Sequence, residues 1–256
     1  MNESDSYYVE KTAFLSNLAH QDELAFRESE DHILVEFGSE ANWLRCLTQE
    51  FPKFIPFLTR QCGIRFHGSI LEIGAGPCWF SAELSKIPDV TEITAMDFSP
   101  RLLKEMAPRV FQLLGALGHK ITRMPGDFHR LEFPDNRFNF VVASAVLHHA
   151  VNMAQLLKET RRVLVPGGQF IAIREQIWPL VKFTSRSQTQ ARLLSAGVNE
   201  HYYTLAEYRQ FFVDADFEFE AIPVNLASGS KRLWNHLVNG LTHARYAFLA
   251  TKPLPR

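Results

Sequence analysis

The sequence is poor in cysteine and has no excess of charge of either sign. Its three cysteines, Cys46, Cys62 and Cys78, are an odd number without metal-site spacing, which indicates free thiols in a reducing compartment. The 27 basic and 28 acidic residues nearly cancel, so no strong positive field is available to attract a nucleic acid. A disulfide scaffold and a nucleic-acid-binding protein are both disfavoured.

The sequence also lacks a long hydrophobic run. Its apolar stretches have the length of a β-strand, as at 141–147, where Ser144 interrupts the run, and none approaches the length of a membrane span. The first five residues are polar and acidic, and no apolar segment follows them, which argues against a secretory signal peptide. We therefore expect a cytoplasmic protein with no membrane partner.

The chain divides into a helical part and a part in which strands and helices alternate. Residues 1–66 show no strand alternation, and Trp43, Leu44 and Leu47 have helical spacing, so a helical N-terminal cap is expected there. From residue 67 to 256 the alternation predicts right-handed crossovers and an α/β, doubly wound, mostly parallel sheet, with a cap insertion at 176–203. The expected strands are 69–74, 92–98, 120–124, 138–147, 169–173, 217–224 and 246–251.

Residues 70–80 (ILEIGAGPCWF) form the most informative motif. An apolar strand pattern ends at Glu72, Gly74 and Gly76 follow, and a helix pattern begins directly after them. Glycines at such a turn let the backbone approach a ligand that a Cβ would exclude. A dinucleotide fingerprint needs a small residue where this chain has Trp79, and no P-loop sequence is present. The motif therefore favours an adenosine-type cofactor over a pyrophosphate, with an ordinary glycine-rich turn as the alternative.

Acidic residues follow the second and third expected strands. Asp97 comes 21 residues after Gly76, where it can accept both hydroxyls of a ribose held by the first loop. Asp127 can accept a hydrogen bond from an adenine amino group, while Phe128 flanks the ring. Either acid could instead be a solvated loop residue or a turn aspartate. Because parallel strands end at one edge of a sheet, these acids and Glu72 together favour one nucleoside site.

These motifs resemble those of the class I S-adenosylmethionine-dependent methyltransferases, in the branch that acts on small molecules. The segments that carry the resemblance are LEIGAG at 71–76, MDFS at 96–99, GD at 126–127, FNFVVASAVLHH at 138–149 and LKETRRVLVPGG at 157–168. They lie within residues 68–175, in the family's order. The resemblance implies a Rossmann-like, mostly parallel seven-stranded sheet with an antiparallel C-terminal hairpin, and S-adenosylmethionine as cofactor.

Matched position by position, the resemblance also implies cofactor-binding residues. It places Glu72 near the methionine amino group, Asp97 at the ribose and Asp127 at the adenine. The full set is Glu72, Gly74, Ala75, Gly76, Asp97, Phe98, Asp127, Phe128 and Ser144. One position departs from the family, because Cys78 stands where a third loop glycine is usual. Its side chain could narrow the pocket or displace the methionine tail of the cofactor.

Catalytic and substrate-binding candidates follow the fourth and fifth strands of the core. The fourth ends in His148 and His149, and in related enzymes such a pair faces the substrate. One imidazole can act as a general base because it titrates near neutral pH, with pocket shaping or helix capping as the alternative. The candidate substrate-binding residues are Arg174, Glu175, Tyr202 and Tyr203. Pairing of the two charges with each other and core packing of the tyrosines are the alternatives, and no metal site is expected.

The sequence thus predicts an S-adenosylmethionine-dependent methyltransferase (EC 2.1.1) that methylates an oxygen or nitrogen atom of a small-molecule acceptor. A nicotinamide-dependent oxidoreductase is an alternative, which Trp79 and Asp127 oppose. A non-catalytic methyltransferase-like binding protein is another, which Cys78 favours. Residues 1–66 could pair across a homodimer. The identity of the acceptor stays open, and carbon methylation is not excluded.

Overall fold

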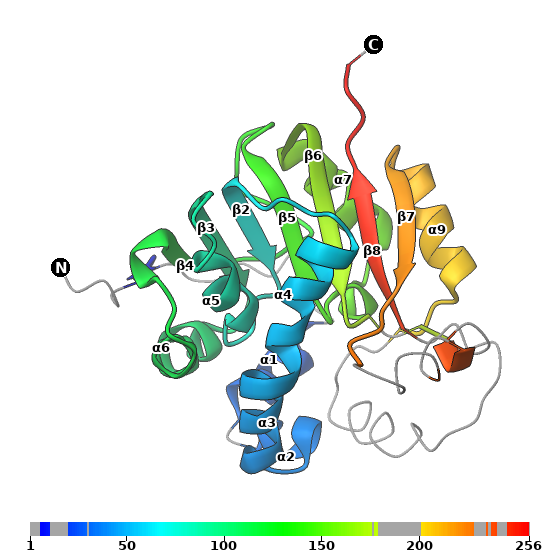
Figure 1. Ribbon diagram of the computed structural model, residues 1–256. Coiled ribbons are helices and arrows are strands. Elements are labelled where there is room, and N and C mark those ends of the chain that lie inside the picture. Colours follow the sequence, from blue (N-terminus) through cyan, green and yellow to red (C-terminus); the bar gives the residue numbers. More distant parts are fainter. Residues whose placement is uncertain are drawn as a thin grey trace.

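The protein is built around one mostly parallel sheet with helices on both faces (Figure 1). The computed structural model describes residues 6–10, 20–29, 31–175, 177–178, 201–227, 234, 237–239 and 245–255. Within them the strands are β1 (Tyr7–Tyr8), β2 (Gly68–Ile73), β3 (Val90–Asp97), β4 (Ile121–Pro125), β5 (Phe138–Ser144), β6 (Leu164–Ile173), β7 (Glu218–Pro223) and β8 (Tyr246–Thr251). Their order is β1-β4-β3-β2-β5-β6-β8-β7, and β8 alone of these runs antiparallel to its neighbours β6 and β7. This is the expected doubly wound sheet with a C-terminal hairpin.

The sheet has eight strands in the described residues, one more than the seven expected. The additional strand is β1, which pairs in parallel with β4 at the edge of the sheet and extends by a hydrogen bond from the Val9 amide to the Arg123 carbonyl (2.9 Å). It consists of two residues, Tyr7 and Tyr8, which is too short to show strand alternation in the sequence. The Tyr8 ring also packs near the cations of Lys104 and Arg123.

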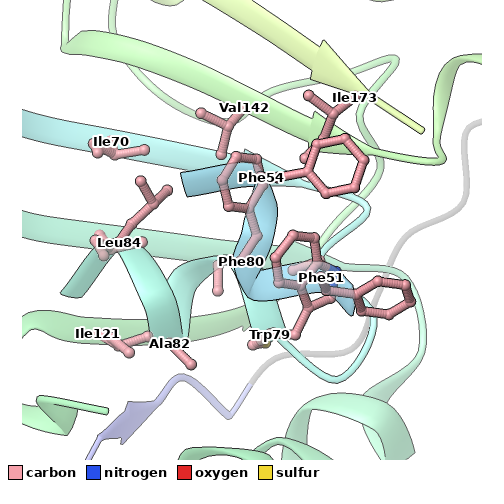
Figure 2. Packing of buried hydrophobic residues seen from close by; sticks show 14 of the residues in the cluster. Phe51, Phe54, Ile70, Trp79, Phe80, Ala82, Leu84, Ile121, Val142 and Ile173 are labelled. Carbon is pink, nitrogen blue, oxygen red and sulfur yellow. The ribbon is translucent and has the colours of Figure 1, made fainter. Parts of the chain in front are cut away.

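Alternate residues of the strands face two separate apolar cores. On β2, Ile70 belongs to the core that contains α5 (Trp79–Ser85) and α6 (Ala107–Leu114), while its neighbour Leu71 belongs to the core that contains α7 (Met153–Val163) and α9 (Leu205–Asp214). Figure 2 shows the first core, in which Phe80 packs near Ile70 and Val142. This two-sided burial is what makes the central strands continuously apolar in sequence.

Between β1 and β2 the described residues are mostly helical and include α1 (His20–Glu28), α2 (His32–Phe37), α3 (Glu40–Arg45) and α4 (Phe54–Pro56). The helices α1–α3 lie beyond the carboxyl ends of the parallel strands (Figure 1), whereas Phe54 of α4 packs in the first core (Figure 2). Around α4 the chain alternates between π-helical, 3-10 and α turns over 46–61. Pro52 and Pro56 cannot donate to the helix ladder, which accounts for the irregularity.

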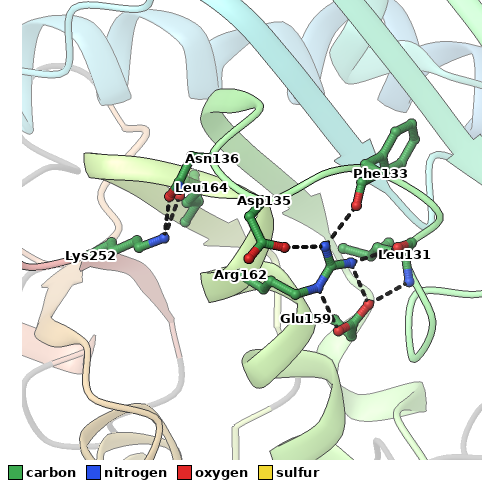
Figure 3. A network of polar contacts seen from close by, with 8 residues as sticks. All are labelled: Leu131, Phe133, Asp135, Asn136, Glu159, Arg162, Leu164 and Lys252. Carbon is green, nitrogen blue, oxygen red and sulfur yellow. Dashed lines mark hydrogen bonds and ion pairs between the residues drawn. The ribbon is translucent and has the colours of Figure 1, made fainter.

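A polar network fixes the amino-terminal end of β5, at the edge of the sheet opposite to the loop glycines. Arg162 on α7 donates to Glu159, to Asp135 and to the carbonyl groups of Leu131 and Phe133 (Figure 3). The Glu159 carboxylate, and to a lesser extent that of Asp135, raises the pKa of the Arg162 guanidinium. The loop before β5 is therefore held by several charge-assisted contacts.

Two further observations concern the limits of the fold. In the part of the chain that the structure describes, no helix has the length and apolar character needed to cross a bilayer. Of the insertion expected at 176–203, residues 176 and 179–200 lie outside the described residues.

Candidate cofactor and acceptor site

The carboxyl ends of the parallel strands and the N-terminal helices enclose one cavity. The space between its walls, open solvent included, amounts to about 870 Å³. The wall from the sheet is formed by Gly74, Ala75, Gly76, Pro77, Asp97, Phe98, Phe128, Ser144, Ala145, Val146, His149 and Arg174. The wall from the helices includes Glu23, Arg27, His32, Glu36, Phe37, Trp43, Leu47 and Phe51. The structure thus brings together most of the residues that the sequence singled out.

The glycine loop after β2 lies directly on the cavity. Gly74 has a φ of 58°, and a Cβ there would lie 2.6 Å from the Val146 side chain, so a larger residue would push the loop after β5 away. Gly76 has a φ of 51°, and its amide donates to Asp97 Oδ2 at 2.7 Å. The loop is therefore tied to the end of β3 and packed against the end of β5.

Asp97 is buried on the cavity wall, as a ribose-binding carboxylate would be. Its Oδ2 accepts from the Gly76 amide and its Oδ1 from the Ser99 amide (2.8 Å). Burial raises the pKa of Asp97, and these amide donors oppose the shift. Each carboxylate oxygen can accept a second hydrogen bond, so a ligand hydroxyl can still be received.

Glu72 hydrogen-bonds to the first turn of α5. It is not among the described residues that line the cavity. It lies behind the loop, where its Oε2 accepts from the Ser81 amide (2.8 Å) and from the Ser81 hydroxyl. Burial raises the pKa of Glu72 to about 8. Because the first residues of α5 have amides without intrahelical partners, Glu72 serves as an acceptor for the start of that helix. Its contact with the methionine amino group stays a prediction.

Cys78 also faces away from the cavity. Its side chain is fully buried, its Sγ lies 3.6 Å from the Gly76 carbonyl oxygen, and it does not appear among the described cavity-lining residues. Its φ of 60° and ψ of 34° are left-handed, a conformation that favours glycine. The family's glycine preference therefore reflects backbone conformation here, and the sulfur does not narrow the cavity.

Phe128 and Asp127 are separated although they are adjacent in sequence. Phe128 lies on the cavity wall, where its ring can contact a base. Asp127 turns away, and its Oδ1 accepts from the His129 amide (2.8 Å) and lies 2.9 Å from His129 Nδ1. An adenine contact by Asp127 stays a prediction.

The two candidate catalytic histidines have different environments. The strand expected to reach residue 147 ends at Ser144, because Ala145 has a φ of 61° and leaves the sheet, and both histidines then lie in a 3-10 turn. His148 is buried, and its Nδ1 lies 2.9 Å from Glu175 Oε2. His149 lies on the cavity wall with Nδ1 3.5 Å from Glu23 Oε1 on α1. His149 is therefore the histidine that a substrate can reach.

Glu175 organises the turn that carries the histidines. Besides His148, it accepts from the Val146 amide at 3.0 Å. Burial raises the pKa of Glu175 to about 7 and lowers the pKa of His148 to about 3, so burial opposes the charged form of each. Neither residue is among the described residues of the cavity wall, and the geometry gives both a supporting position.

Of the remaining substrate-binding candidates, one lies on the cavity wall and two do not appear among its described residues. Arg174 lies on the cavity wall, whereas Tyr202 and Tyr203 are not among its described residues. The Tyr203 ring packs edge-on against Tyr208 and Phe211 of α9. Core packing, the alternative weighed for the tyrosines, is the arrangement that the structure shows for Tyr203.

Sequence reasoning missed the charged residues that α1 and α2 bring to the cavity. Arg27 NH1 lies 2.8 Å from Glu36 Oε2, and Arg27 NH2 lies 3.7 Å from Glu23 Oε1. Glu28 Oε1 accepts from the Ser99 hydroxyl (2.5 Å), which anchors α1 beside Asp97. The only signal in the sequence was the i, i+4 spacing of Glu23 and Arg27, which is typical of an exposed helix face.

Comparison with known proteins adds a sequence match over part of the chain. Residues 71–172 match a family model described as a methyltransferase domain. The chain is 33% identical over 114 residues to sterol 24-C-methyltransferase erg6 of Aspergillus fumigatus, covering 44% of this chain and 29% of that protein. It is 31% identical over 106 residues to a demethylmenaquinone methyltransferase of Listeria monocytogenes, covering 41% of this chain and 44% of that protein. The chain matches less than half the length of these curated relatives.

A solved structure supports the same class of fold. Phosphoethanolamine N-methyltransferase 2 of Haemonchus contortus, in complex with S-adenosyl-L-methionine, is similar with a TM-score of 0.63 and 15% identity, over 90% of this chain and 60% of that one. At this identity the likeness concerns the fold alone. The sequence match over residues 71–172 and this fold together support a class I S-adenosylmethionine-dependent methyltransferase domain, with S-adenosylmethionine as its cofactor.

Proposed function

We propose that the protein transfers a methyl group from S-adenosylmethionine to an oxygen or nitrogen atom of a small-molecule acceptor. The observation that carries the proposal is one cavity whose wall holds the glycine loop and Asp97 on one side and His149 and Arg174 on the other. A cofactor and a proton-accepting side chain can then meet in the same space.

The residues at the first side fit the cofactor. A Cβ built on Gly76 would meet no protein atom within 4 Å, so the space beside this cavity residue is left for a ligand. Asp97 can accept ribose hydroxyls and Phe128 can contact the adenine. The sulfonium of the bound cofactor supplies an activated methyl group, so the protein mainly has to align the acceptor.

At the second side, His149 is suited to remove the proton of the acceptor. Its ring reaches the cavity, and the Glu23 carboxylate near Nδ1 would stabilise the imidazolium that forms when Nε2 takes a proton. His148 lacks this access because it is buried against Glu175. The helices α1–α3 contribute facing residues of the cavity wall.

The relatives do not point to one acceptor. By their names, they act on a sterol at carbon 24, on demethylmenaquinone and on the nitrogen of phosphoethanolamine. The proposal of an oxygen or nitrogen atom therefore depends on His149, since a base near neutral pH assists loss of a proton from a hydroxyl or an amine.

Calorimetric titration with S-adenosylmethionine and S-adenosylhomocysteine tests the proposal. We expect both to bind the wild-type protein, and NAD and NADP not to bind. The variant His149→Gln should keep the affinity for S-adenosylhomocysteine and lose turnover with any acceptor found in a screen for methyl transfer. If the folded protein binds neither S-adenosyl compound, the proposal fails. If His149→Gln keeps full turnover, the assignment of the base fails.

A further inference from the structure

The cavity wall carries two guanidinium groups in different electrostatic settings. Arg27 is ion-paired with Glu36 (2.8 Å) and lies 3.7 Å from Glu23. For Arg174, the part of the chain that the structure describes offers no carboxylate oxygen within 4.0 Å of the guanidinium. Its contacts there are a hydrogen bond from NH1 to Ser144 Oγ (3.2 Å) and the Phe51 ring, whose centroid lies 3.8 Å from the guanidinium carbon.

Arg174 has an unfavourable backbone conformation and a buried charge. Its φ of 62° is left-handed, which costs a residue other than glycine on the order of 1 kcal/mol or more. Burial lowers the pKa of its guanidinium, and the Glu36 carboxylate on α2 acts in the opposite direction. The neighbouring carboxylate, Glu175, does not compensate it by a direct ion pair, because it faces the turn that holds His148. A desolvated cation on a cavity wall is stabilised when an anionic ligand binds beside it.

The position of Arg174 separates it from the nucleoside end of the site. It follows β6, whereas Asp97 ends β3, and the strand order β3-β2-β5-β6 places three strand spacings, about 14 Å, between them. Ser144 and His149 follow the adjacent strand β5. Arg174 is therefore on the side of the cavity where the acceptor would lie, beside the base.

We propose that Arg174 binds a carboxylate of the acceptor, so that the substrate is a small organic anion whose nucleophilic atom is presented to His149. This inference rests on the proposed function. Phe51 covers a face of the guanidinium, which leaves the edge with its planar fork of N–H donors to receive a carboxylate. Arg27 forms a direct ion pair with Glu36 at 2.8 Å, whereas in the described residues Arg174 interacts with the same carboxylate only over a distance longer than an ion pair.

The test uses the whole protein saturated with S-adenosylhomocysteine. Benzoate serves as the probe and benzamide as its neutral counterpart, and binding is followed by NMR of the arginine Nε–Hε groups. We expect benzoate to shift one resonance saturably, that resonance to be missing from Arg174→Gln, and benzamide to have no effect. Benzoate affinity should fall at least about tenfold in Arg174→Gln, the loss expected for a charged hydrogen-bond pair. Arg174→Lys should keep part of it, and Arg137→Gln, at the far end of β5, should keep all of it.

The outcomes separate the inference from the proposed function. If wild-type protein binds no S-adenosylhomocysteine, the proposed function fails. If it binds the cofactor product but benzoate does not bind, or binds Arg174→Gln equally well, the inference is wrong. It is also wrong if Arg174→Gln weakens S-adenosylhomocysteine but not 5′-methylthioadenosine, because Arg174 would then hold the carboxylate of the cofactor itself.

Discussion

Replacing Cys78 by glycine tests which way the side chain at the third loop position faces. Glycine relieves the left-handed strain at φ 60°, a gain of about 1–2 kcal/mol. The change removes a fully buried Cβ and Sγ, which costs about 1.5 kcal/mol, and makes the unfolded chain more flexible, which costs about 0.5–1 kcal/mol. These terms nearly cancel, so we expect a melting temperature within about 4 °C of the wild type.

Cofactor affinity shows more clearly than stability whether the Cys78 side chain faces the core or the cavity. Because Cys78 faces the core, Cys78→Gly should leave the Kd for S-adenosylhomocysteine within about threefold of the wild-type value, less than 1 kcal/mol. Gly76→Ala is the matched variant, since Gly76 has a similar φ (51°) but lies on the cavity wall. Its Cβ should weaken binding by about tenfold or more, or 1.4 kcal/mol.

Calorimetric titration of the three proteins and their thermal melts supply both measurements. A gain of about tenfold in affinity for Cys78→Gly would refute the reasoning, because it would mean that the sulfur does occupy cofactor space. A Gly76→Ala protein that binds as tightly as the wild type would show that the loop is not against the ligand.

Three other changes test the geometry around the loop. Burial raises the folded-state pKa of Glu72 to about 8, so the stability that this group contributes is complete below its ordinary pKa near 4.5 and is lost as the pH rises to 8. Relative to the wild type, Glu72→Gln should therefore become more stable across that range, by an amount on the order of a few kcal/mol. Thermal melts at pH 5 and pH 8 that show a constant difference between the two proteins would contradict this. Gly74→Ala should cost about 2–3 kcal/mol in denaturant unfolding because its Cβ meets Val146, and Val146→Ala should recover part of the loss; no recovery would place the cost elsewhere. Glu28→Ala removes an anchor of α1 and should speed hydrogen exchange of α1 amides but not of β2 amides, and unchanged exchange in α1 would argue against the anchor.

Most of the sheet could be predicted because its strands are buried on both faces and separated by helix patterns. The strand expected at 246–251 has these bounds in β8, and the expected strand at 120–124 differs from β4 by one residue at each end. The edge strand β1 could not be predicted, since its pairing with β4 depends on a tertiary contact of two residues. The end of β5 was missed for a similar reason, because Ala145 adopts a left-handed conformation within an apolar run.

The site could be predicted as a set of strand ends but not as a set of side-chain directions. Asp97 and Phe128 line the cavity, whereas Glu72 and Asp127 accept hydrogen bonds from nearby groups and are not among its described lining residues. A motif fixes the backbone position of such an acid, and the nearest amide or hydroxyl then decides where its carboxylate turns. The contact of Glu23 with His149 could not be predicted from the sequence, because it depends on how α1 packs against a turn more than a hundred residues away in the chain.

The docking of α1 to α3 over the strand ends has a consequence for how this protein can diversify. The cavity residues at the strand ends follow residue 67 in the chain, and the cavity residues from the N-terminal helices precede it. Under the proposed function, substitutions before residue 67 would change which acceptor fits, while the cofactor end of the cavity keeps its geometry. Selection can therefore act on the two ends of one cavity almost independently. The hydrogen bond between Ser99 and Glu28 keeps the two parts of the chain aligned.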